Sequence, residues 1–188
     1  MVLALAMSAS AQKMIDFTHL TATATPQAIP VGYDQPIQGF RWNGIDYVSV
    51  PLYEQWLRSQ LPALAEADGM KTGPEAQVAL IGGPLCYKKH GGTTSSDICR
   101  GTIQVVGPTA YFRPNFVYAS AGWSEDGHQF VTVNAYINGK LIGQRQYDLG
   151  VDAQRLQLVM PDAWGAVTEL AFYPSPGGSV VLYVLELK

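Results

Sequence analysis

The chain has little charge and no long apolar run. Only 14% of its 188 residues are charged, the net charge is −3 and the pI is about 5.5. Nucleic-acid-binding proteins need basic faces to neutralise phosphates, and the densest basic cluster here is Lys88-Lys89. No apolar run approaches the roughly 20 residues that span a bilayer. We therefore expect neither a nucleic-acid partner nor a membrane span.

Catalytic signatures are also missing. The sequence contains no Gly-x-Ser-x-Gly elbow, no His-Glu-x-x-His motif and no phosphate-binding loop. The segment "SEDGH" places Glu125, Asp126 and His128 in one loop. These residues could be metal ligands or an acid–base pair, but a solvated turn at Asp126-Gly127 explains the same pattern. Whether the protein is an enzyme stays open, and we expect no catalytic residues and leave a metal site unassigned.

The first residues resemble the end of an export signal. An apolar start at residues 2–7 leads into Ala9-Ser10-Ala11, the small-residue spacing that signal peptidase recognises, although no basic residue precedes it. We interpret residues 1–11 as the remnant of a signal peptide and residues 12–188 as one secreted, extracellular domain. The alternative is an ordinary apolar strand at the N-terminus.

The cysteine content agrees with export. The chain has two cysteines, Cys86 and Cys99, on either side of a polar, glycine-rich segment. An even number of cysteines in an exported chain predicts a disulfide between them. Zinc binding is the rival interpretation, but it would need more ligands than these two thiols and His90.

Strand signals dominate the rest of the chain. It is rich in glycine and proline, with 19 and 12 residues, and 11% of it is aromatic. Residues 129–137 alternate between polar and apolar positions, and Asn138-Gly139 predicts a hairpin turn back into residues 140–147. Asn43-Gly44 predicts a second hairpin. About ten short strands at regular spacing predict an all-β fold, an antiparallel β-sandwich of jelly-roll type.

One segment has helical periodicity. In "PLYEQWLRSQLPALAEADG", Leu52, Trp56, Leu57 and Leu61 recur at helical spacing. Pro51 suits the first turn of a helix and Pro62 should end or kink it. The sequence thus predicts a short helical insertion. Its aromatic stripe would belong to the core or form a ligand platform.

Three segments resemble a family of secreted β-sandwich domains whose mature chains open with an "IDFEDL"-like strand. They are "MIDFTHL", "GFRWNGIDYV", and the long "FVYASAGWSEDGHQFVTVNAYINGKLIGQRQYDL" followed by "WGAVTELAFYP". Together they cover most of residues 15–188. The resemblance implies a jelly roll similar to galactose-binding and carbohydrate-binding modules.

The chain departs from this family where a structural calcium would bind. Related jelly rolls hold calcium through acidic residues near the first and last strands, and calcium prefers several carboxylate oxygens. Here Thr18 and His19 replace the two acidic residues of the opening motif, which leaves Asp16 alone, and the last strand offers only Glu186. We therefore expect no cofactor, with calcium as the open alternative.

Loop residues at one end of the sandwich are the candidate ligand-binding site. Aromatic rings stack on sugar rings and polar loop residues bind hydroxyl groups. The candidates are Trp123, Glu125, Asp126, Tyr87 and Lys88. We expect a non-catalytic module that binds a polysaccharide or glycan at a cell surface or matrix. The alternatives are a self-associating structural or host-interaction protein, suited by the apolar final strand, and a secreted polysaccharide hydrolase or lyase.

Overall fold

The computed structural model describes residues 13–29, 39–60, 77–82, 99–107, 110–122, 128–150 and 154–188. These residues form strands and two helical segments: β1 (Lys13–Ile15), β2 (Gln27–Ala28), β3 (Phe40–Asn43), β4 (Ile45–Ser49), α1 (Val50–Gln60), β5 (Gln77–Gly82), β6 (Gly101–Val105), β7 (Pro114–Ala121), β8 (Gln129–Ile137), β9 (Lys140–Gly150), β10 (Leu156–Val159), η1 (Asp162–Trp164), β11 (Glu169–Pro174) and β12 (Ser179–Leu187). None of the described helices is long and apolar enough to cross a bilayer.

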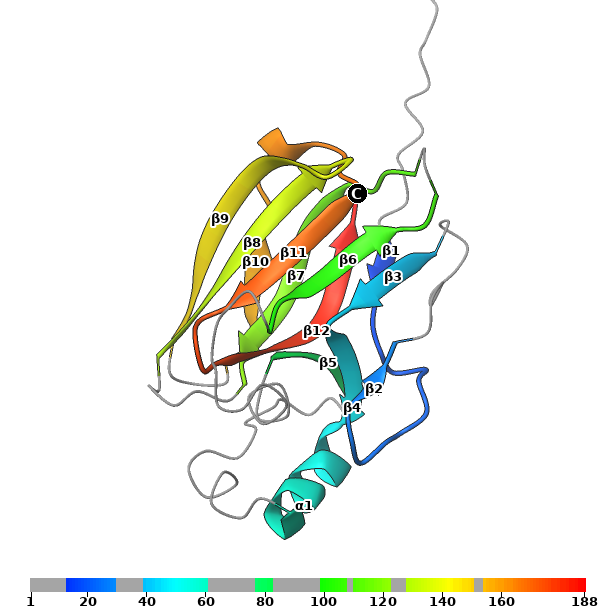
Figure 1. Ribbon diagram of the computed structural model, residues 1–188, viewed down its shortest axis with the longest axis vertical. Helices are drawn as coiled ribbons and strands as arrows, with labels where there is room; N and C mark the ends of the chain where they lie inside the picture. Colours follow the sequence, from blue (N-terminus) through cyan, green and yellow to red (C-terminus); the bar gives the residue numbers. More distant parts are fainter. Residues whose placement is uncertain are drawn as a thin grey trace, which may run out of the picture.

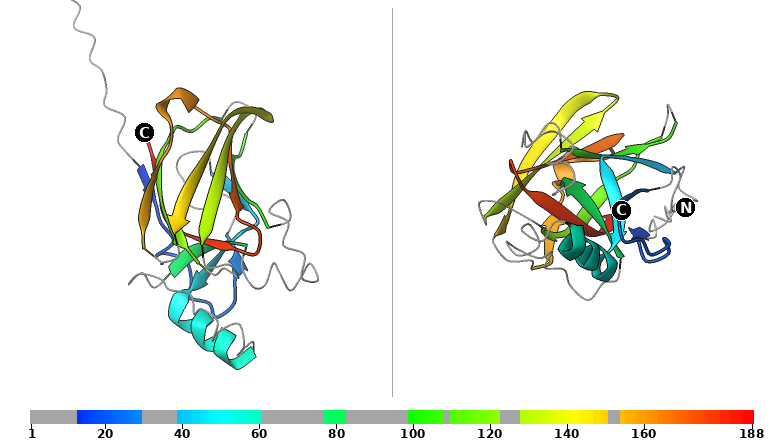
Figure 2. Two further views of the ribbon diagram at one scale, coloured as in Figure 1. Left: turned by 90° about the vertical axis from the view of Figure 1, so that its left-hand side faces the viewer. Right: turned by 60° about the horizontal axis from the view of Figure 1, so that its bottom comes forward.

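The strands form two antiparallel sheets packed face to face (Figures 1 and 2). In the seven-stranded sheet the order is β10-β7-β12-β5-β4-β2, and β1 pairs with the far end of β12. In the five-stranded sheet the order is β3-β6-β11-β8-β9. The predicted antiparallel β-sandwich with a short helical insertion is confirmed.

The strand order from β5 onward is that of a jelly roll. β5, β12, β7 and β10 are neighbours in one sheet, and β6, β11, β8 and β9 are neighbours in the other. The chain therefore crosses between the sheets at most connections and builds two four-stranded layers, as jelly rolls do. β4, β2 and β1 extend the first layer and β3 extends the second.

The two Asn-Gly pairs have different roles. At Asn138-Gly139 both residues have positive φ, 49° and 78°, and the chain returns as β9 paired with β8. This confirms the predicted hairpin, because a type I′ turn needs two successive positive φ values. The hairpin predicted at Asn43-Gly44 is wrong. β3 pairs with β6 and β4 pairs with β5, so the chain changes sheets at Gly44.

The first strand is shorter than the opening motif suggests. β1 ends at Ile15, and the Asp16 carboxylate accepts hydrogen bonds from the backbone N–H and the hydroxyl of Thr18, at 3.1 and 2.8 Å. An Asx turn of this kind competes with strand pairing and reverses the chain. Phe17, the central residue of this turn, packs into the core. Its ring lies edge-to-face with that of Trp42, with 5.7 Å between the ring centroids.

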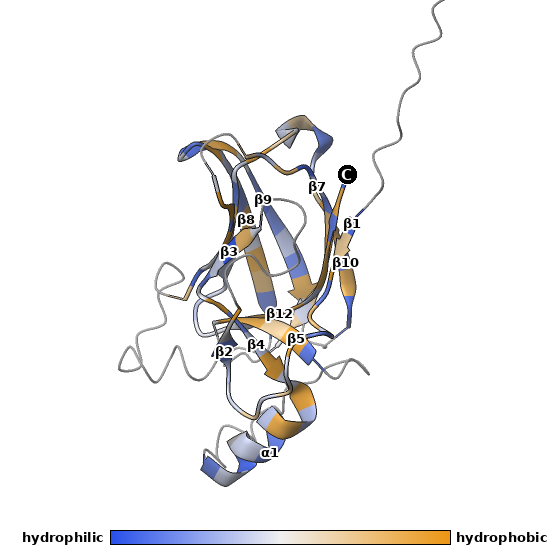
Figure 3. Ribbon diagram, turned by 90° about the vertical axis from the view of Figure 1, so that its right-hand side faces the viewer, coloured by the Kyte–Doolittle hydropathy of each residue, from blue (hydrophilic) through white to orange (hydrophobic). Residues whose placement is uncertain are grey.

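The main core lies between the two sheets, and a second apolar cluster covers the outside of the seven-stranded sheet. Every residue of β12 is buried, because its two faces contact these two clusters. Figure 3 shows the apolar character of this strand. Tyr53 of α1 is 1% exposed and packs against Val48 and Val78. The stripe on α1 is therefore core at Tyr53, and Trp56 stacks on it at 5.9 Å.

Substitution of Gly44 by alanine should destabilise the fold more than the same change at Gly139. Both glycines have positive φ, a conformation that costs an alanine about 1–2 kcal/mol. A Cβ on Gly44 would also lie 2.3 Å from the carbonyl oxygen of Arg100, whereas nothing lies within 4 Å of one on Gly139. The clash should add roughly 1–3 kcal/mol. Urea unfolding of both variants measures the difference, and equal losses would contradict the close approach at Gly44.

Tyr147 should make stability depend on alkaline pH. Its hydroxyl donates to the Val159 carbonyl at 2.7 Å and so joins β9 to β10 across the edge of the sandwich. Burial raises the pKa of Tyr147 from 10.0 to about 12. A raised pKa means that the folded state favours the neutral phenol. The contribution of Tyr147 to the stability of the fold is therefore complete below pH 10.0 and is lost as the pH rises to about 12.

Tyr147→Phe tests this link. The variant should be about 1 kcal/mol less stable at neutral pH because it lacks the hydrogen bond. It should then lose less stability than the wild type between about pH 10 and pH 12, measured by urea unfolding at each pH. An unchanged slope in the variant would show that another group controls the alkaline transition.

Candidate functional site

The outer face of the five-stranded sheet carries an ordered set of polar side chains. Strand alternation buries Val133, Ala135 and Phe172 completely in the core. It directs the intervening residues of β8 and β11 away from the core, because successive side chains of a strand point to opposite faces. Cross-strand register then sets Glu169 beside Tyr136.

Four hydrogen bonds connect five side chains on this face. Arg100 donates to the Tyr173 hydroxyl at 3.3 Å, and the hydroxyls of Tyr173 and Tyr136 are 3.5 Å apart. Asn134 donates to the Tyr136 hydroxyl at 3.2 Å, and Gln144 donates to the Asn134 oxygen at 3.0 Å. We call these five residues the polar row. The row runs from the start of β6 across β11 and β8 to β9.

Local electrostatics keep the polar row neutral apart from Arg100. Burial, followed by the hydrogen bond with Tyr136, raises the pKa of Tyr173, so this phenol remains protonated at neutral pH. The hydrogen bond with Tyr173 raises the pKa of Arg100. Burial also raises the pKa of Glu169, and the nearby Arg100 charge opposes that rise. The phenols can therefore both donate and accept hydrogen bonds.

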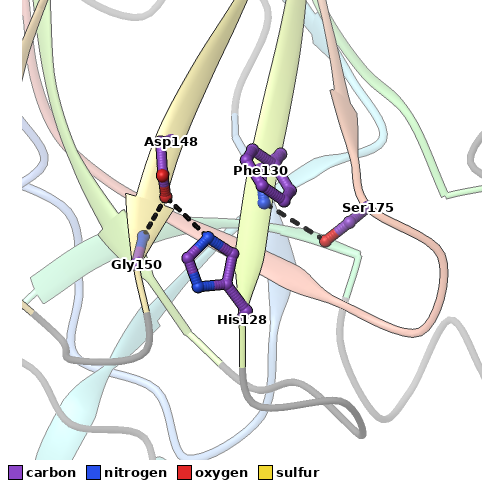
Figure 4. A network of polar contacts seen from close by, with 5 residues as sticks. All are labelled: His128, Phe130, Asp148, Gly150 and Ser175. Carbon is purple, nitrogen blue, oxygen red and sulfur yellow. Dashed lines mark hydrogen bonds and ion pairs between the residues drawn. The ribbon is translucent and has the colours of Figure 1, made fainter.

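His128 lies at one end of the same face. Its Nε2 is 3.0 Å from a carboxylate oxygen of Asp148, which also accepts the Gly150 backbone N–H at 2.8 Å (Figure 4). The ring of His128 packs against that of Phe130, with centroids 4.8 Å apart. The acid–base partner that this structure assigns to His128 is thus Asp148 on β9. The β8–β9 hairpin register could have indicated it, but two bulges shift the pairing.

The five predicted ligand residues, Trp123, Glu125, Asp126, Tyr87 and Lys88, lie outside the described residues. The strands that flank them end together at the lower left of Figure 1. Ser179 at the start of β12 pairs with Gly82 at the end of β5, and the next residue pairs with Ala121 at the end of β7. Both predicted loops therefore start from the end of the sandwich that also carries Arg100 and His128.

Of the two cysteines predicted to form a disulfide, the structure describes only Cys99. Cys99 takes part in a disulfide, whereas Cys86, the only other cysteine of the chain, lies outside the described residues. Gly82 lies close to Cys99, since a Cβ built on it would be 3.7 Å from the Cys99 Cβ. The pairing with Cys86 stays a prediction.

The two carboxylates considered for calcium have other partners. Asp16 accepts two hydrogen bonds from Thr18, and Glu186 accepts one from the Asn115 amide. β1 pairs with β12 so that Met14 lies beside Glu186. Among the described residues, no group of three His, Cys, Asp or Glu side chains could hold a metal ion.

Two of the chain's four tryptophans are buried. Trp42 is 5% exposed and Trp164 is 8% exposed, and both belong to the main core. A Cβ on Gly143 would meet the Trp164 indole nitrogen at 2.1 Å, so this ring lies against the β9 backbone. Neither ring presents a face to a ligand.

Comparison with known proteins supports the fold. No family model and no curated protein matches the chain. A solved structure does: a crystal structure of a DUF4465 family protein from Bacteroides caccae superposes with a TM-score of 0.57. The match covers 95% of this chain and 100% of that chain, at 11% sequence identity. The two proteins share a fold, and the site has to be argued from the residues of this chain.

The predicted Cys86–Cys99 disulfide should be visible in the oxidised protein. Intact mass before and after reduction should differ by two hydrogens, and a Cys86–Cys99 linked peptide should appear after digestion without reductant. Cys99→Ser should lower the free energy of unfolding by about 3 kcal/mol, the loop-closure contribution of a loop of this length. Detection of two free thiols in protein purified without reductant would contradict the pairing.

Proposed function

We propose that the protein is a secreted, non-catalytic module that binds carbohydrate at a cell surface or in an extracellular matrix. The polar row is the observation that carries this proposal. Amide, hydroxyl and guanidinium groups placed side by side match the closely spaced hydroxyls of a sugar, because each can donate or accept in a fixed direction. Five strands backed by a packed core hold these groups in place.

The loop residues would complete the surface. Trp123 follows β7 by two residues, and Tyr87 lies in the segment between β5 and Cys99. Their rings would stack on sugar rings beside the Arg100 end of the polar row. Lys88, Glu125 and Asp126 would add polar contacts. A glycan chain could then extend from the loops along the sheet.

The resemblance to the "IDFEDL" domains and the oxidised Cys99 support export. Disulfides persist mainly in oxidising compartments, so a protein that holds one is expected outside the cytosol. The apolar start of the chain with its small-residue cleavage pattern points the same way. A binding module working on an external polymer would need this route.

Self-association is the second candidate function, and one surface favours it. Met14, Phe116 and Val159 lie in one row across the outside of the seven-stranded sheet, with the buried Glu186 of β12 between Met14 and Phe116. Met14 is 56% and Val159 52% exposed. Exposed apolar rows of this kind occur at protein interfaces. The final strand cannot be the associating edge suggested by its sequence, because β12 has partners on both sides.

A pull-down on insoluble polysaccharides tests the carbohydrate proposal. The protein comprising residues 12–188 should bind saturably to at least one of cellulose, chitin, β-glucan, mannan or insoluble pectin. Trp123→Ala and Tyr87→Ala should each weaken that binding about tenfold, since an aromatic stacking contact contributes on the order of 1 kcal/mol or more. A chelator in parallel samples reports whether calcium takes part.

Tyr111→Ala is the matched control. Tyr111 is 46% exposed and follows β6 at the opposite end of the sandwich, so its loss should leave binding unchanged. Absence of binding to every polymer would refute the proposal. Concentration-dependent oligomers that Val159→Ser dissociates would then favour self-association.

A further inference from the structure

The polar row has more hydrogen-bond donors than acceptors. The Tyr173 oxygen accepts from Arg100 and the Tyr136 oxygen accepts from Asn134. If either phenol donates to the other, the second keeps a hydroxyl hydrogen with no acceptor among the described residues. This result is the same for both directions of the bond, because each phenol carries one hydrogen.

Arg100 adds to this excess. A guanidinium has five N–H donors, and in the described part of the chain Arg100 uses one of them, on Tyr173. Its side chain is exposed, so the remaining donors are accessible. Among the described residues, the carboxylate that acts on the Arg100 charge is that of Glu169, which is itself partly buried. The outward surface at this point is therefore a positively charged group of donors.

A bound group that satisfies these donors must be rich in acceptors. A neutral sugar hydroxyl brings one donor with its two acceptor positions and no charge, so it corrects the excess only in part. A carboxylate brings four lone-pair positions, no donor and a negative charge, and its planar shape matches the fork of a guanidinium. Hydrogen bonds between such charged groups are roughly twice as strong as neutral ones.

We infer that Arg100, Tyr173 and Tyr136 bind the carboxylate of a uronic acid, so that the protein selects acidic over neutral polysaccharides. This inference rests on the proposed function and specifies its ligand class. The guanidinium and the one phenol that does not donate to the other would donate to the carboxylate, with Asn134 and Gln144 holding Tyr136 in position. Sulfate esters offer similar acceptors but lack the planar, two-oxygen shape, so the experiment separates them.

Polygalacturonate and its fully methyl-esterified form are the matched probes. Esterification removes the charge and keeps the sugar backbone. Affinity electrophoresis should show retardation by polygalacturonate at least tenfold stronger than by the ester, as expected for loss of a charge-assisted hydrogen bond. A sulfated dextran serves as the third arm and should retard the protein no more than the ester does.

Arg100→Gln and Tyr173→Phe should each reduce the preference for polygalacturonate about tenfold. Glu169→Gln should increase affinity for polygalacturonate, because it removes the negative charge beside Tyr136. Arg145→Gln and Tyr111→Phe are the controls for charge and for loss of a phenol. Arg145 lies over the Tyr147 ring on the edge strand β9, and it points to the opposite face of that strand from its neighbour Gln144. Unfolding midpoints of all variants confirm that each one folds.

The outcomes separate the inference from the proposed function. Equal affinity for polygalacturonate and its ester, or a preference that Arg100→Gln and Tyr173→Phe leave intact, would overturn the carboxylate site while carbohydrate binding stands. Stronger retardation by sulfated dextran than by the methyl ester would also overturn the carboxylate site. Failure to bind any acidic or neutral polymer would refute carbohydrate binding itself.

Discussion

The last strand of the chain organises the whole sandwich. β12 pairs with β5 along its first half, with β1 along its end, and with β7 along most of its length. All nine of its residues are buried, since the main core contacts one face and the cluster under α1 contacts the other. The pairing with β1 joins the first and last described strands. Assembly of the seven-stranded sheet therefore requires contacts between residues far apart in sequence, a feature of slowly folding β-proteins.

The main core lies behind the outer face of the five-stranded sheet, which carries the polar row. Asn134, Tyr136 and Tyr173 each have a buried neighbour in the same strand, as Asn134 has Val133 and Ala135. Side chains placed by strands lose less freedom on binding than those on unsupported loops, which favours affinity. The same sandwich directs the loops with Trp123 and Tyr87 from one end.

Predictability from sequence differed between features that look alike. The β8–β9 hairpin was predictable because its turn, alternation and pairing all lie within one continuous segment. The same dipeptide at Asn43-Gly44 does not form the hairpin that the sequence predicts. There, Gly44 takes a positive φ alone, and the chain passes beneath the Arg100 carbonyl from one sheet to the other. No local signal distinguishes a return within a sheet from a crossing between sheets, because both need a tight turn.

The candidate site shows the same division. The sequence determined which positions of β8 face outward, through the period of two that a strand imposes, and it determined the fold class and the approximate limits of α1. Only the tertiary structure decided that β11 lies beside β8, which sets Tyr173 next to Tyr136 and brings Arg100 to the same face. The physical reason is that strand order depends on how two apolar faces bury each other across the entire chain. Hydrophobic burial is non-directional, so the alternation that reports it does not name the partner strand.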